Sequence, residues 1–448
     1  MHFSVGSTKC MKHLLNEFSK SVDKEINKKS HRVQEKLDKQ LVTFFNSMTE
    51  SYDAIKKIKR SPKTFISKLS KIKIPEQIPK SDLLNSKYIS HSVKKYITDH
   101  ATIDLCYKFV INNKEYTIHF ILLDEKEMVN PEKYEIYIEK MMMWLHMSQS
   151  YVTGKCAEKS FTVYLYLTPF EKFLPECSIT VIGPDNVNSG VAYACQDNGE
   201  IVIYRQEEWF KVFIHESFHA LGLDFSTMKQ DQLNKNIKYL FPIETEGNLF
   251  EAYTECWARI INCLFISFYT LDKRNSIKER KEEFILTAEY CLQFEANFAV
   301  FQMVKVLQCM GLTYDHLYAA DNRMELTRKL LYKENSNVFA YYIITSILLS
   351  NYSYFISWCY ENNLNLLEFT KTLSNLQSFY EMIERLYLSK KYLHYVGTYE
   401  NFLYNLTKTI THKRDDENSK NSGSKKKNEE QEEKEYLFYT ARMTICEV

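Results

Sequence analysis

The first part of the chain has the hydrophobic pattern of a helix. Apolar residues recur at helical spacing over residues 8–60, among many charged ones, and neither glycine nor proline interrupts them. Pro75 and Pro79, with polar residues around them, mark a boundary. Residues 1–80 contain 18 Lys and Arg against 8 Asp and Glu, a net charge of +10, so the remainder carries −9. We therefore expect residues 1–100 to form a basic helical arm that could bind an acidic partner.

The pattern changes to that of β-strands from residue 104. Two apolar or alternating segments flank Asn112-Asn113-Lys114, which is typical of a hairpin turn. A second hairpin is predicted where Gln196-Asp197-Asn198-Gly199 joins two further segments. The expected strands of the two hairpins are residues 104–111, 115–123, 190–195 and 200–204, with additional strands at 161–167 and 178–182 and a helix at 131–147.

The second half of the chain predicts helices from residue 249 to about 412, because it has long apolar runs and few prolines or glycines. Residues 335–360 contain no charged side chain and are long enough to span a bilayer, but five tyrosines and several Ser, Thr and Asn residues would be costly in lipid. We expect a buried helix or helix pair there. Residues 413–435 have the composition of a disordered charged linker. We expect the apolar tail 436–448 either to dock back on the protein as a strand or to bind a partner, and we favour docking.

Composition excludes some classes of function. The chain of 448 residues has a net charge of +1 and no glycine-rich phosphate loop, so it carries no strong signal for nucleic-acid binding. Eleven cysteines are scattered without a C-x-x-C pair, which favours reduced thiols over a disulfide framework. The first residues lack the apolar core of a signal peptide. These features predict an intracellular, cytoplasmic protein outside the membrane.

The strongest chemical signal is the motif HESFH at residues 215–219. On a helix its two histidines lie one turn apart on one face, where both imidazoles can bind the same Zn²⁺ ion, and Glu216 can reach a water on that metal. The flanking positions from Val212 to Leu221 are uncharged and mostly apolar, as a buried helix requires, and Gly222 supplies a C-terminal stop. The motif predicts a zinc hydrolase site with His215 and His219 as ligands.

A catalytic zinc site needs a third protein ligand, and we favour Glu251. It begins a helix expected over Leu249–Tyr269, and Glu255 follows one turn later on the same face. The arrangement resembles the gluzincin metallopeptidases, in which HExxH supplies two ligands, a glutamate of a following helix supplies the third, and an acidic residue four positions later orients a ligand histidine. The resemblance covers about residues 190–269 and implies that Glu255 orients such a histidine. The gap before Glu251 is longer than in the shortest family members.

The resemblance also implies an α+β fold of the zincin-like type. In such domains a small mixed sheet lies over the active-site helix, and an edge strand pairs with extended substrate. The sequence leaves open which arm of the second hairpin is that edge. The same stretch is similar to uncharacterised HExxH proteins of large nucleocytoplasmic DNA viruses, which implies a place in the host cytoplasm or the virion. The expected regions are a helical N-terminal arm at 1–100, a zincin-like catalytic domain at 101–270, a helical region at 271–412, a linker at 413–435 and a tail at 436–448.

Other acidic residues compete for the third ligand position. The motif also begins like the metzincin pattern HExxHxxGxxH, but the third-histidine position is Phe225, which cannot bind metal. Asp224 lies one residue out of that register and is either a ligand or a turn residue after the helix. Glu244 and Glu246 are further acidic neighbours that we expect in a solvated loop.

We therefore predict a zinc metallopeptidase that hydrolyses a protein or peptide substrate with Glu216 as general base. Tyr253, Arg259 and Tyr239 are candidate donors to the developing oxyanion. Two other functions stay open: a structural or assembly protein of a virion that keeps zinc without turnover, and a zinc hydrolase of a non-peptide amide or ester. Catalysis needs Glu216, whereas metal retention does not.

Overall fold

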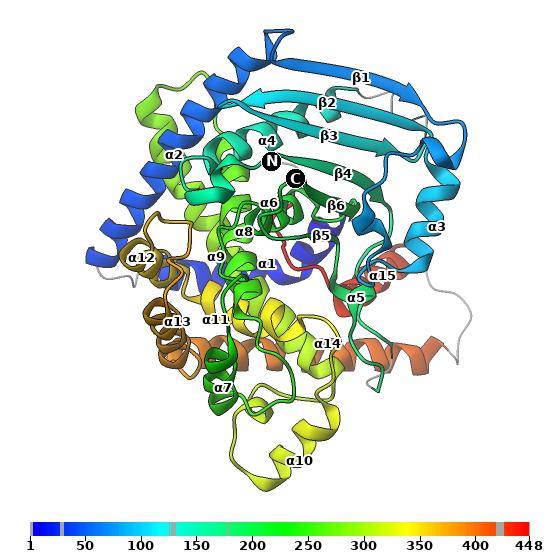
Figure 1. Cartoon of the computed structure of the whole chain (residues 1–448). Coiled ribbons are helices and arrows are strands. Elements are labelled where there is room, and N and C mark those ends of the chain that lie inside the picture. Colours follow the sequence, from blue (N-terminus) through cyan, green and yellow to red (C-terminus); the bar gives the residue numbers. More distant parts are fainter. Residues whose placement is uncertain are drawn as a thin grey trace.

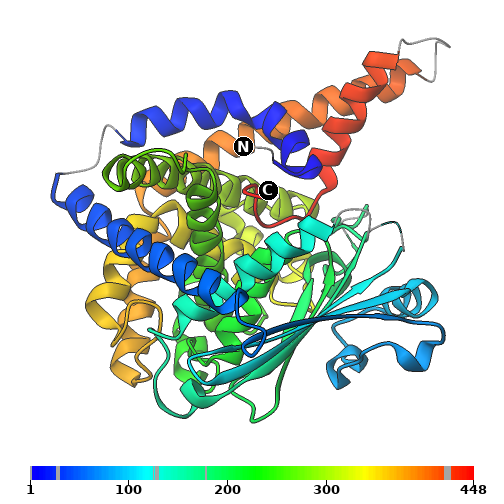
Figure 2. The same ribbon diagram turned by 90° about the horizontal axis from the view of Figure 1, so that it is seen from above.

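The computed structural model describes residues 3–26, 31–124, 126, 131–176, 179–417 and 425–447. The protein is mixed α+β, as the sequence predicts: a six-stranded sheet lies along one side of a larger helical body (Figures 1 and 2). Within the described residues, no helix combines the length and apolar character needed to cross a membrane.

The sheet has the order β1-β2-β3-β4-β6-β5. Its strands are β1 (Phe65–Lys71), β2 (Ile103–Ile111), β3 (Lys114–Leu122), β4 (Phe161–Thr168), β5 (Gly190–Ala192) and β6 (Gly199–Arg205). β3 pairs with β4 and β4 with β6 in parallel, and the remaining neighbours are antiparallel. The short strand β5 therefore forms one edge of the sheet.

Both predicted hairpins are present. β2 and β3 turn at Asn112 and Asn113, whose φ angles of 49° and 62° suit the two central positions of a primed hairpin turn. β5 and β6 form the second hairpin. The strand predicted at 178–182 is wrong: residue 178 lies outside the described residues, and only Ile182 forms an isolated bridge, with Glu334.

Strand β1 was not predicted, because it lies within the region expected to be helical. Most of its side chains are exposed, so its sequence has little of the apolar pattern that marks a buried strand. Its backbone pairs along its whole length with β2, from Phe65 opposite Phe109 to Lys71 opposite Ile103. The basic N-terminal region thus contributes a strand to the sheet as well as helices.

The two faces of the sheet are covered differently. The inner face packs on α4 (Pro131–Ser148) and α6 (Trp209–Ala220), within the main apolar core. The outer face carries a second, smaller apolar cluster that includes residues of α3 (His91–His100), which Figure 2 shows on the far side of the sheet from the helical body. Helix α6 therefore lies between the sheet and the helical body.

The predicted helical region is confirmed. Within this region α8 (Leu249–Tyr269) and α9 (Ile277–Cys309) pack against each other, and α8 packs on α6. The uncharged run at 335–360 is mostly buried and helical. The other elements of the body are α5 (Pro184–Val187), α7 (Asp231–Leu240), α10 (Asn322–Leu331), the π-helix η6 (Phe339–Ile344), α11 (Thr345–Ser350), α12 (Tyr352–Asn362), α13 (Leu373–Leu386) and α14 (Lys390–Glu417). Short 3₁₀ turns lie at η1 (Pro75–Gln77), η2 (Asp82–Asn85), η4 (Gly154–Glu158) and η5 (Asp315–Leu317).

The N-terminal helices α1 (Val5–Ile26) and α2 (His31–Lys59) confirm the prediction of helix over most of 8–60. They are packed on the body rather than extended from it, because α2 buries an apolar face that includes Leu41 and Phe44. Some of their basic side chains pair within the molecule, such as Lys36 with Glu361 at 2.6 Å between Nζ and Oε1.

The predicted disordered linker at 413–435 is wrong where the structure describes it. α14 continues to Glu417 and α15 spans Lys425–Tyr439, while residues 418–424 lie outside the described residues. Lys and Glu are good helix formers, and the pair Glu430–Lys434 has the favourable i, i+4 spacing. The tail docks as predicted, although only Thr440 pairs like a strand, in a bridge with Phe173.

One disulfide departs from the expectation of reduced thiols. Cys156 of η4 and Cys195, which follows β5, are bonded, with their Cα atoms 5.3 Å apart. They are 39 residues apart in the sequence, so no local spacing could have indicated the pair. Cys10, Cys106, Cys256, Cys263, Cys291, Cys359 and Cys446 are free thiols.

Candidate metal centre

Helix α6 carries the HESFH motif and is buried along its whole length. Apolar side chains on both sides suit its place between the sheet and α8 (Figure 1). The helix ends at Ala220, and Gly222 follows with a φ of +64°, which glycine adopts without strain. His215, Glu216 and His219 are 5%, 7% and 7% exposed, so their side chains can meet only groups that the fold brings to them.

Helix α8 brings Glu251 to the two histidines. Oε2 of Glu251 lies 3.2 Å from Nε2 of His215 and 3.4 Å from Nε2 of His219, and the two Nε2 atoms are 3.3 Å apart. Ligand atoms about 2.0–2.1 Å from a tetrahedral metal ion are separated from one another by about 3.3–3.4 Å. The three atoms therefore have the spacing of three corners of a tetrahedral metal site, as the sequence predicts for these residues.

Two more carboxylates hold the far sides of the imidazole rings. Oε2 of Glu255 lies 3.0 Å from Nδ1 of His215, where the resemblance to gluzincins placed it. Oδ2 of Asp224 lies 2.5 Å from Nδ1 of His219. When both Nδ1 atoms carry the proton, both Nε2 lone pairs face the space shared with Glu251, so the two carboxylates set the tautomer that metal binding requires.

The position of Asp224 revises the prediction for that residue. It is not placed as a ligand, because His219 separates its carboxylate from the shared space. The turn interpretation is correct in part, since Oδ1 accepts a hydrogen bond from the backbone N–H of Ser226 at 2.6 Å. Its contact with His219 was not foreseen. Glu244 and Glu246 are exposed, as expected, and belong to no ligand group within the described residues.

Both oxygens of Glu251 accept hydrogen bonds from residues that the sequence did not indicate. Nδ2 of Asn337 donates to Oε1 at 3.0 Å, and the hydroxyl of Tyr341 donates to Oε2 at 3.2 Å. Asn248, just before α8, donates in turn to Asn337 at 2.9 Å. Tyr341 belongs to the π-helix η6, and π-helical turns often occur at functional sites. Asn337 and Tyr341 are 86 and 90 residues from Glu251 in the sequence, so spacing gave no signal.

Burial and charge act against each other in this cluster. Burial alone would lower the pKa of both imidazoles, but the surrounding carboxylates outweigh it and raise the pKa of His215 and His219 above the ordinary value. Burial would likewise raise the pKa of Glu251, yet the two histidines lower it. These shifts describe one set of mutually attracting charges. A divalent cation in the shared space would replace the protons that the histidines otherwise bind.

Glu216 faces a different environment. Burial raises the pKa of its carboxyl above the ordinary value, while the charges of His215 and His219 act to lower it. It lines a small cavity together with His215 and Glu255. The remaining lining residues are Lys172, Val187, Asn188, Ser189, Gly190, Lys211, Val212, Tyr341 and Met443.

Strand β5 approaches the motif closely through Gly190. A Cβ atom at this position would lie 2.9 Å from Oε1 of Glu216 and 2.8 Å from Cγ1 of Val212. Only a residue without a side chain fits between the sheet edge and α6. The close approach places the edge strand directly beside the carboxylate of Glu216.

The three predicted oxyanion donors do not lie at this cavity. Tyr253 is fully buried and its hydroxyl donates to the backbone oxygen of Leu367. Arg259 is buried and pairs with Glu295 at 2.5 Å. Tyr239 is 84% exposed. The structure does not bring these three residues to the cavity, because sequence position does not determine which way a side chain points. Tyr341 is the tyrosine that lines the cavity.

A second group of possible ligand atoms, Cys263, Glu295 and Cys446, also occurs within the described residues. Its carboxylate is already engaged: Glu295 pairs with Arg259 and accepts hydrogen bonds from the hydroxyl of Thr444 and from the N–H of Ile445. Within the described residues Glu251 pairs with no lysine or arginine, and its oxygen that faces the histidines accepts one further hydrogen bond, from the hydroxyl of Tyr341. The group on α6 and α8 is therefore the better candidate.

Comparison with family models, curated proteins and solved structures finds no match to the chain. The site is therefore interpreted from its own geometry.

Proposed function

We propose that the protein is a zinc-dependent peptidase with its active site between α6, α8 and the edge strand β5. The observation that carries the proposal is the convergence of His215, His219 and Glu251, with their three ligand atoms 3.2–3.4 Å apart and the carboxylate of Glu216 beside them. The α+β architecture with a short edge strand over the motif helix supports the resemblance to gluzincins of the zincin-like type.

The donor set fits zinc. Two imidazole nitrogens and one carboxylate oxygen are a common catalytic set for this ion, which keeps a fourth position for water or substrate. Zinc bound by these three residues would lower the pKa of a water molecule towards neutrality and polarise a substrate carbonyl. Glu255 and Asp224 would keep both Nε2 atoms free of protons.

Glu216 is the residue that accepts the proton of the attacking water and passes it to the leaving amine. Its burial favours the protonated form, which suits a group that must give the proton back within one turnover. Gly190 keeps the space beside the carboxylate open. Removing the carboxylate charge therefore stops the chemistry without removing a ligand.

Tyr341 is the donor that would stabilise the developing oxyanion. Its hydroxyl lies 3.2 Å from Oε2 of Glu251, and Tyr341 is the one tyrosine among the residues that line the cavity. Burial raises the pKa of this phenol, so the hydroxyl keeps its proton and can donate it in a hydrogen bond.

The substrate class follows from the sheet edge. β5 pairs with β6 on one side only, so its other backbone groups can pair with an extended peptide next to Glu216. Such pairing recognises the peptide backbone itself, whereas the side chains of the cavity select among sequences. A peptide or protein substrate is therefore favoured over a small amide or ester.

Glu216→Gln tests the proposal, with Glu244→Gln as a matched control on an exposed acid. We expect both variants to bind one zinc per chain, and Glu216→Gln to lose about 10²–10⁴-fold in the rate of peptide-library cleavage while the control keeps it. Zinc without cleavage in any form, the unsubstituted chain included, would favour a structural role for the metal. A wild-type chain that binds no zinc would reject the proposal.

A further inference from the structure

The segment that follows α15, Thr440–Glu447, runs through the interior of the molecule behind the metal centre, and we name it the tail segment. Its side chains at Arg442, Thr444 and Cys446 are 1%, 0% and 2% exposed. Buried polar side chains of other elements donate hydrogen bonds to its backbone. Nε2 of Gln302 donates to the carbonyl of Arg442, and Nδ2 of Asn262 donates to the carbonyl of Cys446. Such a segment is held by specific hydrogen bonds rather than by apolar contact alone.

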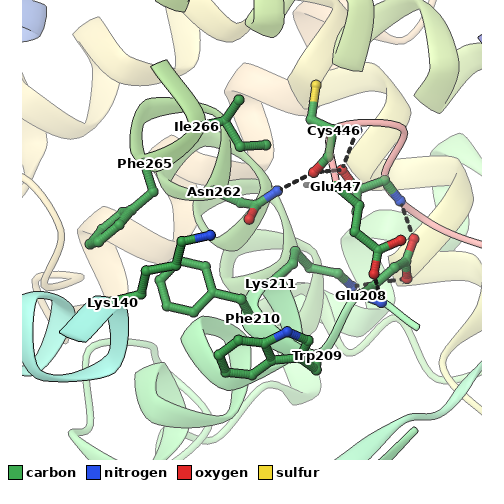
Figure 3. Close-up of a pocket in the computed structure, with 11 residues that line it drawn as sticks. Lys140, Glu208, Trp209, Phe210, Lys211, Asn262, Phe265, Ile266, Cys446 and Glu447 are labelled. Carbon is green, nitrogen blue, oxygen red and sulfur yellow. Dashed lines mark hydrogen bonds and ion pairs between the residues drawn. The ribbon is translucent and has the colours of Figure 1, made fainter. Parts of the chain in front are cut away.

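The tail segment is bonded to the start of α6 through Glu208. The N–H of Thr444 donates to Oε1 of Glu208 at 2.6 Å, and the N–H of Glu208 donates to Oε1 of Glu447 at 2.6 Å. Figure 3 shows Glu208 next to Glu447 in the cavity behind the motif helix. Glu208 has a φ of 59°, so this junction requires an unusual backbone conformation that the two bonds help to hold.

Lys211 connects this junction with the metal centre. Its Nζ lies 2.9 and 3.1 Å from the two oxygens of Glu255 and 3.9 Å from Oε2 of Glu208. Sδ of Met443, in the tail segment, lies 3.6 Å from the same ammonium. Lys211 is 3% exposed, so these groups replace the water that would otherwise surround its charge.

We propose that Lys211 and the tail segment position Glu255, and through it His215, for metal binding. The proposal rests on the metal site put forward above. Glu255 must be correctly turned to accept the Nδ1–H of His215, and Glu216 and Glu251 place further negative charge nearby. The ammonium of Lys211 balances that charge from behind, and Glu208 with the tail segment holds the ammonium in place.

The position of Glu255 depends on Lys211, because the ammonium contacts both of its oxygens and so fixes the plane of the carboxylate. Without these contacts the carboxylate can turn away from Nδ1 of His215. The ring of His215 could then leave the orientation that metal binding requires. Lys211 is therefore a positioning residue that touches neither metal nor substrate.

The test uses the full chain and three lysine variants. Lys211→Met removes the charge but keeps an apolar stem, Lys211→Arg keeps the charge, and Lys140→Met is the matched control. Lys140 lines the neighbouring cavity in Figure 3, and its Nζ lies over the rings of Phe210 and Tyr269, at 5.9 and 5.3 Å. Each variant is first shown to be folded without metal by circular dichroism and thermal unfolding.

We expect Lys211→Met to raise the Kd for Zn²⁺ about 10- to 100-fold, as losses behind a metal ligand usually do. Lys211→Arg should recover most of this loss, and Lys140→Met should stay within about twofold of wild type, a range typical of sites that do not interact. The visible spectrum of the Co²⁺-loaded protein should change in Lys211→Met alone, because it reports the geometry of the ligands. An unchanged Kd and Co²⁺ spectrum in folded Lys211→Met would refute the proposal.

Glu208→Gln tests the role of the tail segment in positioning Lys211, and this test remains informative if Lys211→Met does not fold. It keeps the shape of the side chain and the pair between Lys211 and Glu255, but weakens the bond to Thr444 and the hold on the ammonium. We expect a smaller rise in the Kd for Zn²⁺ that exceeds the effect of Lys140→Met. An effect no larger than that control would remove the tail segment from the proposal. Failure of wild type to bind zinc would instead refute the metal site, and this inference with it.

Discussion

Two histidine–carboxylate groups lie on opposite faces of the sheet and differ in what surrounds them. On the outer face, Nδ1 of His119 lies 2.9 Å from Oδ1 of Asp104. Below the inner face, Nδ1 of His215 lies 3.0 Å from Oε2 of Glu255. The two contacts are alike in atoms and distance. The contact itself therefore does not distinguish a metal ligand from a solitary pair.

The difference lies at the other nitrogen of each ring. Nε2 of His215 faces Nε2 of His219 and a carboxylate oxygen at ligand spacing, whereas His119 stacks on Tyr164 with ring centroids 5.3 Å apart. Burial would lower the pKa of His119, but Asp104 and Cys106 raise it to about 9. The pKa is raised for His119, His215 and His219 alike, so it does not distinguish the two groups. The candidate metal centre is distinguished by three ligand atoms that face one shared space, and not by the carboxylate partner of a histidine.

The largest effect is expected at the ligand shared by both histidines. Glu251→Ala should abolish stoichiometric zinc, because two imidazoles alone leave the ion with too few protein ligands. His119→Asn, on the other face of the sheet, should keep one zinc per chain. Elemental analysis of both purified variants after dialysis measures the difference. Full zinc content in Glu251→Ala would show that another residue is the third ligand.

Tyr341→Phe should affect turnover and leave the metal in place. Its hydroxyl is one of two donors to the oxygens of Glu251, but it is not a ligand. Loss of a single donor to an oxyanion typically lowers kcat about 10²–10³-fold. Tyr239→Phe is the matched control, since that tyrosine is exposed. Equal kcat values for the two variants would exclude Tyr341 as the donor.

Asp224→Asn and Glu255→Gln should each weaken zinc binding about 10- to 100-fold without abolishing it. Each removes the charge behind one imidazole while keeping the shape of the side chain. The sequence left Asp224 as either a ligand or a turn residue, and the contact with His219 gives it a different role. Competition with a chelator of known affinity gives both constants. If Asp224→Asn binds zinc like wild type, its role is confined to the turn at Ser226.

The candidate metal centre could be predicted largely from the sequence because its parts are local. Helical spacing alone puts His215 and His219 on one face, and Glu251 and Glu255 on one face of a second helix. The packing of these two helix faces against each other then brings the ligand atoms together. The hairpin at Asn112 and Asn113 was predictable for the same reason, since the turn requirement is contained in the turn itself.

What the sequence did not reveal depends on contacts between distant segments. Tyr341 reaches Glu251 across 90 residues, and Thr444 reaches Glu208 across 236. Neither residue belongs to a motif, and in the sequence the surroundings of Tyr341 indicate only a buried helix. Strand β1 was missed because an edge strand is held by backbone bonds that leave little trace in side-chain pattern. Helical or strand periodicity can identify a buried face but not its partner.

The smallest effect concerns the outer-face pair and appears only in the pH dependence of stability. Because the folded pKa of His119, about 9, exceeds its ordinary 6.5, the pair stabilises the folded protein fully below about pH 6.5, and the contribution is lost as the pH rises towards 9. The side chain is 18% exposed, so we expect a contribution of about 1–3 kcal/mol. His119→Gln should therefore lower the free energy of unfolding near pH 6 and leave it nearly unchanged above pH 9. Chemical unfolding of both proteins with zinc removed measures the difference free of any change in metal binding. A constant difference across this range would mean that the loss of packing, and not the paired charge, determines the effect.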